Sequence, residues 1–227
     1  MTAQQKTEPE SRWINPAVQL RSRDSLERIL GATARLLATR SFRDIKVTEI
    51  AHEAGASPTS VYARFENKQA LLGALFERHA IAQREFIGQL LDADRWQGVP
   101  LAVALRQTFP VIVAGYCAKQ GLIRAFLEQA SEDARFREDW SEVGNFIAGR
   151  VSQLALARLF EIDHPSPERG IQIVLGIAFA TLAHQIQMRE IDKPQMDEIT
   201  EELIRMMLRY MGIADVSTIT GGSPDES

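Results

Sequence analysis

Apolar residues recur at helical spacing along almost the whole of this 227-residue chain. The first stripe runs through Leu26, Ile29, Leu30, Leu36 and Leu37. A period near 3.6 residues predicts amphipathic helices, whereas strands need an alternation of polar and apolar residues. No stretch alternates for long enough to predict a strand. The fold class is therefore predicted to be all-α.

Periodicity and capping residues together predict nine helices. They lie at about residues 23–39, 47–54, 58–65, 67–90, 99–118, 121–131, 135–160, 167–190 and 194–211. Pro110 falls inside the fifth, which it should kink or divide. The most apolar stretch, residues 171–188, is interrupted by glutamines and His184. It is predicted to be a buried helix rather than a membrane span. A single cysteine, Cys117, permits no intramolecular disulfide and fits a reducing compartment.

The net charge of −4 conceals an asymmetry along the chain. Residues 1–80 carry 12 Lys and Arg against 9 Asp and Glu, whereas residues 81–227 carry 14 against 21. An acidic total argues against a protein that coats nucleic acid indiscriminately. One basic face is still compatible with this total, because binding depends on the local field.

Residues 47–68 form the most informative segment, VTEIAHEAGASPTSVYARFENK. A short helix, a glycine and a second short helix are typical of a helix-turn-helix. Gly55 permits the positive φ of a tight turn, and Ser57 before Pro58 predicts the cap of the second helix. The two helices should be held together by buried apolar residues, namely Ile50, Ala51, Ala54, Val61 and Phe65. The second helix would then present polar side chains to the major groove of DNA.

This segment resembles the DNA-binding domain of the TetR family of transcriptional repressors. The residues that carry the resemblance are Ile50-Ala51, Ala54-Gly55-Ala56-Ser57, Val61-Tyr62, Phe65, Lys68 and Leu71. The resemblance covers about residues 23–76, and the rest of the chain is similar to the family in layout only. Three positions depart from the family pattern, the first being Thr48, which stands where the family has an arginine-like residue. Ser41 stands before Phe42 where glycine is common, and Lys46 stands where a Ser or Thr cap is common.

The resemblance implies contacts with the phosphates of DNA. Tyr62 is expected to donate its hydroxyl to a phosphate, and Lys68 to do the same with help from the N-terminal field of its helix. Lys46 and Thr48 are further phosphate candidates. Ser57 is a candidate DNA contact too, although its position suits a helix cap.

Three residues of the second helix are candidate base readers: Thr59, Ser60 and Arg64. Of these, Arg64 is the strongest candidate, because arginine pairs bidentately with guanine. Since this helix has few long polar side chains, part of the sequence specificity is expected to come from DNA shape.

The resemblance also implies how the rest of the chain is organised. Residues 21–66 would be the DNA-binding domain, and residues 67–211 a larger helical domain for effector binding and dimerisation. Residues 1–20 and 212–227 are predicted to be flexible tails. The final helix is apolar on more than one face, so a homodimer is expected through the last two long helices. A twofold dimer suits a palindromic DNA operator.

A ligand pocket is implied by the family rather than by the residues. The aromatic residues available to line it are Phe109, Tyr116, Phe126, Trp140, Phe146 and Phe160. Nothing in the sequence indicates a strongly charged effector, so a small, largely apolar molecule is expected. It would release a repressor from DNA by favouring the arrangement of the dimer that mismatches the operator. No cofactor is expected, and the chain should work in the cytoplasm.

Two other functions stay open from the sequence. The first is a DNA-binding dimer without a small-molecule effector. The second is a helical di-metal carboxylate enzyme, because Glu49/His52 and Glu161/His164 have the Glu-x-x-His spacing of such sites. Glu49 and His52 lie within the helix-turn-helix, however, and His164 directly precedes a proline. No metal site and no catalytic residue is therefore predicted, and the chain is not expected to be an enzyme.

Overall fold

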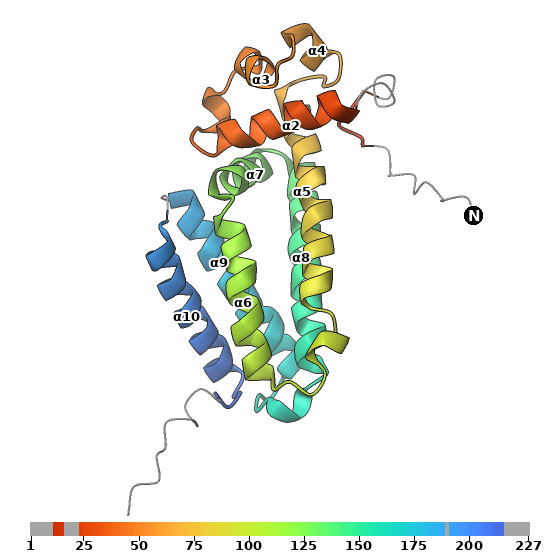
Figure 1. The fold of residues 1–227 in the computed structure, drawn as a ribbon. Helices are drawn as coiled ribbons and strands as arrows, with labels where there is room; N and C mark the ends of the chain where they lie inside the picture. Colours follow the sequence, from red (N-terminus) through yellow and green to blue (C-terminus); the bar gives the residue numbers. More distant parts are fainter. Residues whose placement is uncertain (1–10, 16–22, 189–190, 216–227) are drawn as a thin grey trace, which may run out of the picture. The chain divides into compact units, whose positions relative to one another are not determined.

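The computed structural model describes residues 11–15, 23–188 and 191–215 (Figure 1). All regular structure in these residues is helical, which confirms the all-α class. The chain divides into two compact units, Met1–Ala82 and Gln83–Ser227. Helix α5 (Lys68–Leu90) begins in the first unit and ends in the second.

The first unit is a small helical domain built around α3. Its elements are α2 (Arg23–Leu37), the short 3-10 helix η1 (Phe42–Asp44), α3 (Val47–Glu53), α4 (Pro58–Tyr62) and the start of α5. Helix α3 packs against both α2 and α4. The centre of the domain is made of completely buried side chains from each element, among them Ile29, Leu37, Ile50, Phe65 and Leu71.

Residues 11–15 pack on this domain, although the sequence placed them in a flexible tail. The Ile14 side chain is buried, and the backbone N–H of Asn15 donates to the carbonyl of Arg64 at 2.9 Å. The Trp13 indole lies directly over Gly73, where any Cβ would collide with the ring. When apolar side chains pack on a domain in this way, they hold a terminal segment in place that a purely polar sequence would leave mobile. The rest of that tail lies outside the described residues.

The second unit is a bundle of longer helices (Figure 1). It contains the end of α5, the 3-10 helix η2 (Asp94–Trp96), α6 (Leu101–Cys117), α7 (Gln120–Glu132), α8 (Ala134–Leu156), the 3-10 helix η3 (Leu159–Glu161), α9 (Pro167–Met188) and α10 (Lys193–Tyr210). Helix α10 packs against α6 and α9, while α8 packs against α7 and α9. The sequence predicts a kink or a division at Pro110, but α6 continues through this residue without a break.

The end of the described chain is held by an arginine of α6. The Arg106 guanidinium bonds Asp215 at 2.6 Å and Glu201 of α10 at 3.0 Å. Ile213 is buried as well. Residues 212–215 are therefore anchored, although the sequence assigned them to a flexible tail. Residues 216–227 lie outside the described residues.

Helix α9 has one buried face and one exposed face. Its length and apolar composition would allow it to cross a membrane. A third of its most apolar stretch is buried within the chain. Val174, Ala178 and Leu182 face the core, whereas Ile173 and Ile177 are exposed. The prediction of a buried helix is thus correct for one face only. The other face leaves a row of apolar side chains uncovered by the described residues of a single chain.

Candidate nucleic-acid interface

The turn between α3 and α4 has the geometry that the sequence predicted. Gly55 follows α3 with a φ of 61°, in the left-handed region that residues with a side chain rarely adopt. Ser57 Oγ then accepts the backbone N–H of Ser60 at 3.1 Å and caps α4. The apolar residues assigned to hold the two helices together are all buried: Ile50, Ala51, Ala54, Val61 and Phe65. The helix-turn-helix is therefore a rigid platform.

Helix α4 turns polar and aromatic side chains towards solvent. Ser57 and Thr59 are exposed, and Ser60 is half-buried. Tyr62 is 56% exposed, although most large aromatic side chains of this domain are buried. An exposed phenol has an O–H that can donate a hydrogen bond. The exposed face of α4 is polar, as is expected of a helix that enters the major groove.

The start of α3 adds two exposed side chains, Lys46 and Thr48. Lys46 stands where the family commonly has a cap, and the structure shows what replaces it. The Glu49 carboxylate accepts the backbone N–H of Lys46 at 2.7 Å, and it also binds Arg40 at 2.6 Å. The hydrogen bond from Arg40 and then that from Lys46 lower the pKa of Glu49. Sequence reasoning missed this cap, although Glu at the third helical position was its signal.

Lys68 is occupied within the chain. Its ammonium donates to the carbonyls of Phe42 at 2.6 Å, Ile45 at 2.9 Å and Arg43 at 3.2 Å. It also lies over the Phe42 ring, 4.4 Å from the centroid. Burial lowers the pKa of Lys68, and Asp44 opposes that effect. Lys68 therefore holds the segment that leads into α3, and its expected phosphate contact stays a prediction.

The expectation that Arg64 points outward is wrong. Arg64 is only 8% exposed, and its Nε has no hydrogen-bond partner among the described residues. The reason is that α4 ends at Tyr62, so Arg64 lies in the following turn rather than on the helix face. Its backbone carbonyl accepts the N–H of Asn15, which ties this turn to residues 11–15. Arg64 therefore does not belong to the exposed surface of α4.

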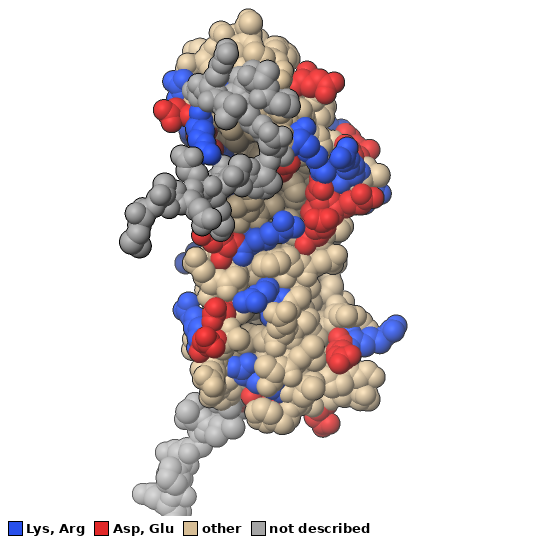
Figure 2. Space-filling view, turned by 90° about the vertical axis from the view of Figure 1, so that its right-hand side faces the viewer, with Lys and Arg blue, Asp and Glu red and all other residues tan. Residues whose placement is uncertain are grey.

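Ion pairs engage several arginines of the first unit. Arg35 bonds Glu53 at 2.7 Å, and Arg40 bonds Glu49 at 2.6 Å. On the face that Figure 2 shows, basic and acidic side chains alternate and form no patch of one sign. Mixed charges of this kind on the face shown do not favour indiscriminate coating of nucleic acid there.

The two Glu-x-x-His pairs do not form a metal centre. Glu49 is held by Arg40, and Glu161 accepts the backbone N–H of Leu101 at 2.7 Å. His164 Nδ1 accepts the N–H of Ser166 at 3.1 Å. Within the described ranges, no three His, Cys, Asp or Glu side chains gather so that they could hold a metal ion.

The aromatic residues proposed to line a ligand pocket lie in the second unit. Phe109 and Phe126 are fully buried, whereas Tyr116, Trp140 and Phe146 are half-buried. The Phe126 ring packs 6.1 Å from that of Trp140. Burial raises the pKa of Tyr116 strongly.

Comparison with known proteins supports the sequence resemblance. Residues 29–75 match the family model described as bacterial regulatory proteins, tetR family. A comparison with curated proteins gives no match. Proteins described by this family model regulate transcription and are not enzymes.

Solved structures share the fold over most of the chain. A putative TetR-family regulator from Mesorhizobium loti is 16% identical, with a TM-score of 0.69 over 84% of this chain and 98% of that one. Thermus thermophilus FadR, a TetR-family repressor in complex with lauroyl-CoA, is 22% identical, with a TM-score of 0.55 over 89% and 99%. Salmonella enterica GusR is 16% identical, with a TM-score of 0.61 over 86% and 99%. The chain thus has a TetR-type DNA-binding domain within a TetR-like all-helical fold.

Proposed function

We propose that this regulator binds a palindromic DNA operator as a homodimer in the cytoplasm, and that it is a repressor released by a small, largely apolar ligand. The observation that carries the proposal is the exposed surface of α4. Thr59 and Tyr62 stand in solvent on a helix whose other side, at Val61, is buried. A rigid helix with a free polar face is what major-groove recognition requires.

The contacts with DNA divide between phosphates and bases. Tyr62, Lys46 and Thr48 are the proposed phosphate contacts, because all three are exposed around the helix-turn-helix. Ser57 can reach a phosphate only with the lone pairs and proton that its capping bond leaves free. Thr59 and Ser60 are the proposed base contacts. With so few long side chains at the groove, DNA shape supplies part of the specificity.

The proposed dimer forms through α9 and α10. Ile173, Ile177 and Met188 of α9 and Tyr210 of α10 are large apolar side chains that remain exposed in one chain. Covering them with the same face of a second copy removes apolar area from water and generates a twofold axis. That axis would present two copies of α4 to two half-sites.

The proposed effector binds among the half-buried aromatic residues of the second unit, Tyr116, Trp140 and Phe146. A fold neighbour, the Thermus FadR, is described with lauroyl-CoA bound, which supports a ligand for this chain without identifying it. A coupling free energy of about 1–3 kcal/mol would change DNA affinity by roughly 5–150-fold. The second candidate, a regulator without an effector, differs only in lacking this coupling.

Selection of bound sequences from random duplex DNA tests the proposal. The expected result is enrichment of one palindrome, with tight binding that weakens as salt rises. Two protomers per duplex should appear in analytical ultracentrifugation. If a folded, dimeric protein enriches no sequence even at low salt, the proposed function is wrong. Screening apolar compounds against the selected duplex then separates a ligand-released repressor from a regulator without an effector.

A further inference from the structure

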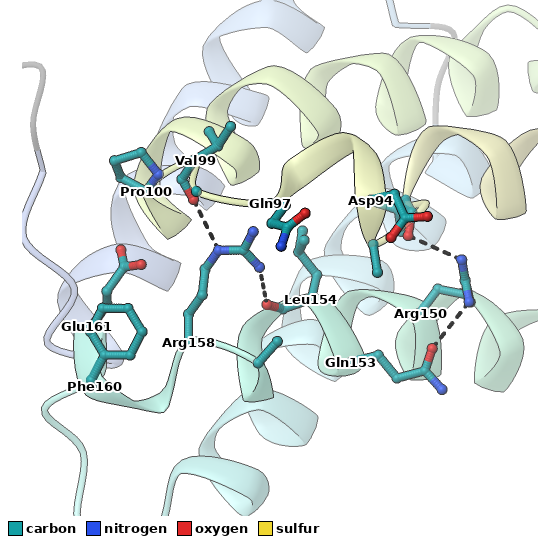
Figure 3. A pocket seen from close by; sticks show the side chains of 14 residues that line it. Asp94, Gln97, Val99, Pro100, Arg150, Gln153, Leu154, Arg158, Phe160 and Glu161 are labelled. Carbon is teal, nitrogen blue, oxygen red and sulfur yellow. Dashed lines mark hydrogen bonds between the residues drawn. The ribbon is translucent and has the colours of Figure 1, made fainter.

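A cavity of about 630 Å³ lies in the second unit, at the end where α5 and α8 finish and α6 begins (Figure 3). Its walls come from residues 91–100, from the last turns of α8 and from η3. Of the aromatic residues that the sequence offers for an effector pocket, Phe160 lines this cavity, whereas Phe109, Tyr116, Phe126, Trp140 and Phe146 do not. Its volume is within the range of small-molecule sites.

The apolar part of the wall ends in an exposed aromatic ring. Leu91, Val99, Leu154 and Ala157 line the interior. Phe160, on η3, lies at the rim and is 86% exposed. No packing within the described residues accounts for a phenylalanine kept so fully in water. A flat apolar molecule in the cavity would cover part of this ring and gain the hydrophobic free energy of doing so.

The polar part of the wall is rich in hydrogen-bond donors. Arg150 donates to Gln153 Oε1 at 3.2 Å and to the carbonyls of Gly88 and Leu91, while its buried Nε has no partner among the described residues. The bond to Gln153 leaves that residue's amide N–H groups available. Figure 3 shows Gln97 between the two arginines that line the cavity.

The second arginine, Arg158, is buried and bonds backbone carbonyls only. It donates to Val99 and Leu154, both at 2.9 Å, and to Trp96. No carboxylate among the described residues pairs with Arg150 or Arg158. The cavity wall contains two carboxylates, and neither forms an ion pair with these arginines. Glu161 accepts the backbone N–H of Leu101, and Asp94 is exposed. A guanidinium bound only by neutral groups has its strongest remaining interaction with an anion.

We propose that this cavity binds a small organic anion with a flat apolar body. The anionic group would lie at Arg150, Gln153 and Gln97, and the body would lie along Leu154 against the ring of Phe160. This site does not include Tyr116, Trp140 or Phe146, where the effector is proposed to bind, and it does not depend on the proposed DNA binding.

The test uses 2-naphthoate as the probe and 2-naphthamide as its neutral counterpart of nearly the same shape. Both are titrated into the full-length protein and followed by methyl NMR. Naphthoate is expected to shift the methyl signals of Leu91, Val99 and Leu154 and to bind about tenfold more tightly than naphthamide, as one charge-assisted hydrogen bond allows. Equal affinities, or shifts confined to other methyl groups, would overturn the proposal.

Variants separate the two halves of the wall. Arg150→Gln should remove the preference for naphthoate, and Phe160→Ser should weaken both probes. Arg135→Gln is the matched control, because Arg135 is exposed on the same helix and does not line the cavity. Since Arg150 also bonds the end of α5, Gln97→Ala provides a variant at an exposed residue that should weaken naphthoate selectively. If neither Gln97→Ala nor Phe160→Ser changes naphthoate binding, the proposal is wrong.

Discussion

The ammonium of Lys68 lies 2.6 Å from the carbonyl oxygen of Phe42 and 4.4 Å from the centroid of the same residue's ring. Lys68 is the first residue of α5, and Phe42 opens the turn that leads into α3. The beginning of α5 therefore fixes the approach to the helix-turn-helix. Both residues belong to the first unit, and their contact forms in the absence of DNA.

Lys68→Met should destabilise the free protein. Three backbone carbonyls would lose a charged donor. A hydrogen bond to a charged group contributes about 1.5–3 kcal/mol to stability, and these three bonds share one ammonium, so their contributions do not add up in full. We expect a loss of about 1–3 kcal/mol in the free energy of unfolding, measured with urea in the absence of DNA. Faster amide exchange at Val47 and Thr48 should accompany it. Wild-type stability, combined with a salt slope of DNA binding lower by about 0.9, would instead identify a phosphate contact.

Glu49 should make the stability of the protein depend on pH. Its pKa is lowered in the folded state, so its contribution is present above the unfolded pKa of about 4.3 and is lost as pH falls through the folded value. Glu49→Gln should therefore lower the melting temperature at neutral pH. The gap to wild type should narrow as the solution is acidified below about pH 4. A gap that stays constant down to pH 2 would show that the charge of Glu49 does not matter. Glu66→Gln, at an exposed residue of the same domain, is the control.

Thr59 and Arg64 should differ in their effect on sequence preference. Thr59 is exposed on α4, whereas Arg64 is buried in the turn that follows. Thr59→Ala should relax selection at one or two base pairs of each half-site by about tenfold, since a good base contact discriminates by about 1–3 kcal/mol. Arg64→Met should leave the selected sequence unchanged. Sequencing of the DNA selected by each variant measures this difference. If Arg64→Met selects a different palindrome, Arg64 does contact the bases.

These contrasts show how far sequence alone could go. The turn at Gly55, the helix cap at Ser57 and the exposure of Tyr62 agree with the sequence predictions. Each follows from a local signal: a glycine after a helix, a serine before proline, and a position on one turn of helix. The sequence predicts neither the carbonyl contacts of Lys68 nor the burial of Arg64, because what decides their surroundings is distant in sequence. Lys68 meets carbonyls up to 26 residues earlier, and Arg64 lies where residues 11–15 pack. The cavity at Arg150 was missed for the same reason, since its walls are separated by some 60 residues.

Lys46 and Tyr62 should be distinguishable by salt. Lys46→Gln removes a charge, so the slope of log affinity against log salt should fall by about 0.9 for each protomer. Tyr62→Phe removes only a hydroxyl; it should weaken DNA binding about 3–10-fold and leave that slope unchanged. Both side chains are exposed, so thermal stability should not change. An unchanged slope for Lys46→Gln would remove Lys46 from the proposed phosphate contacts.

Ile177→Glu should break the dimer. Ile177 is 47% exposed on α9, next to exposed Ile173, and the proposed interface would bury it. A twofold axis would bring two such carboxylates together in an apolar contact, which should weaken dimerisation by about a hundredfold or more. Sedimentation equilibrium measures this directly, and circular dichroism checks that the helices persist. Gln89→Glu, at an exposed position on α5, is the charge-matched control. A fully dimeric Ile177→Glu protein would exclude this face of α9 from the interface.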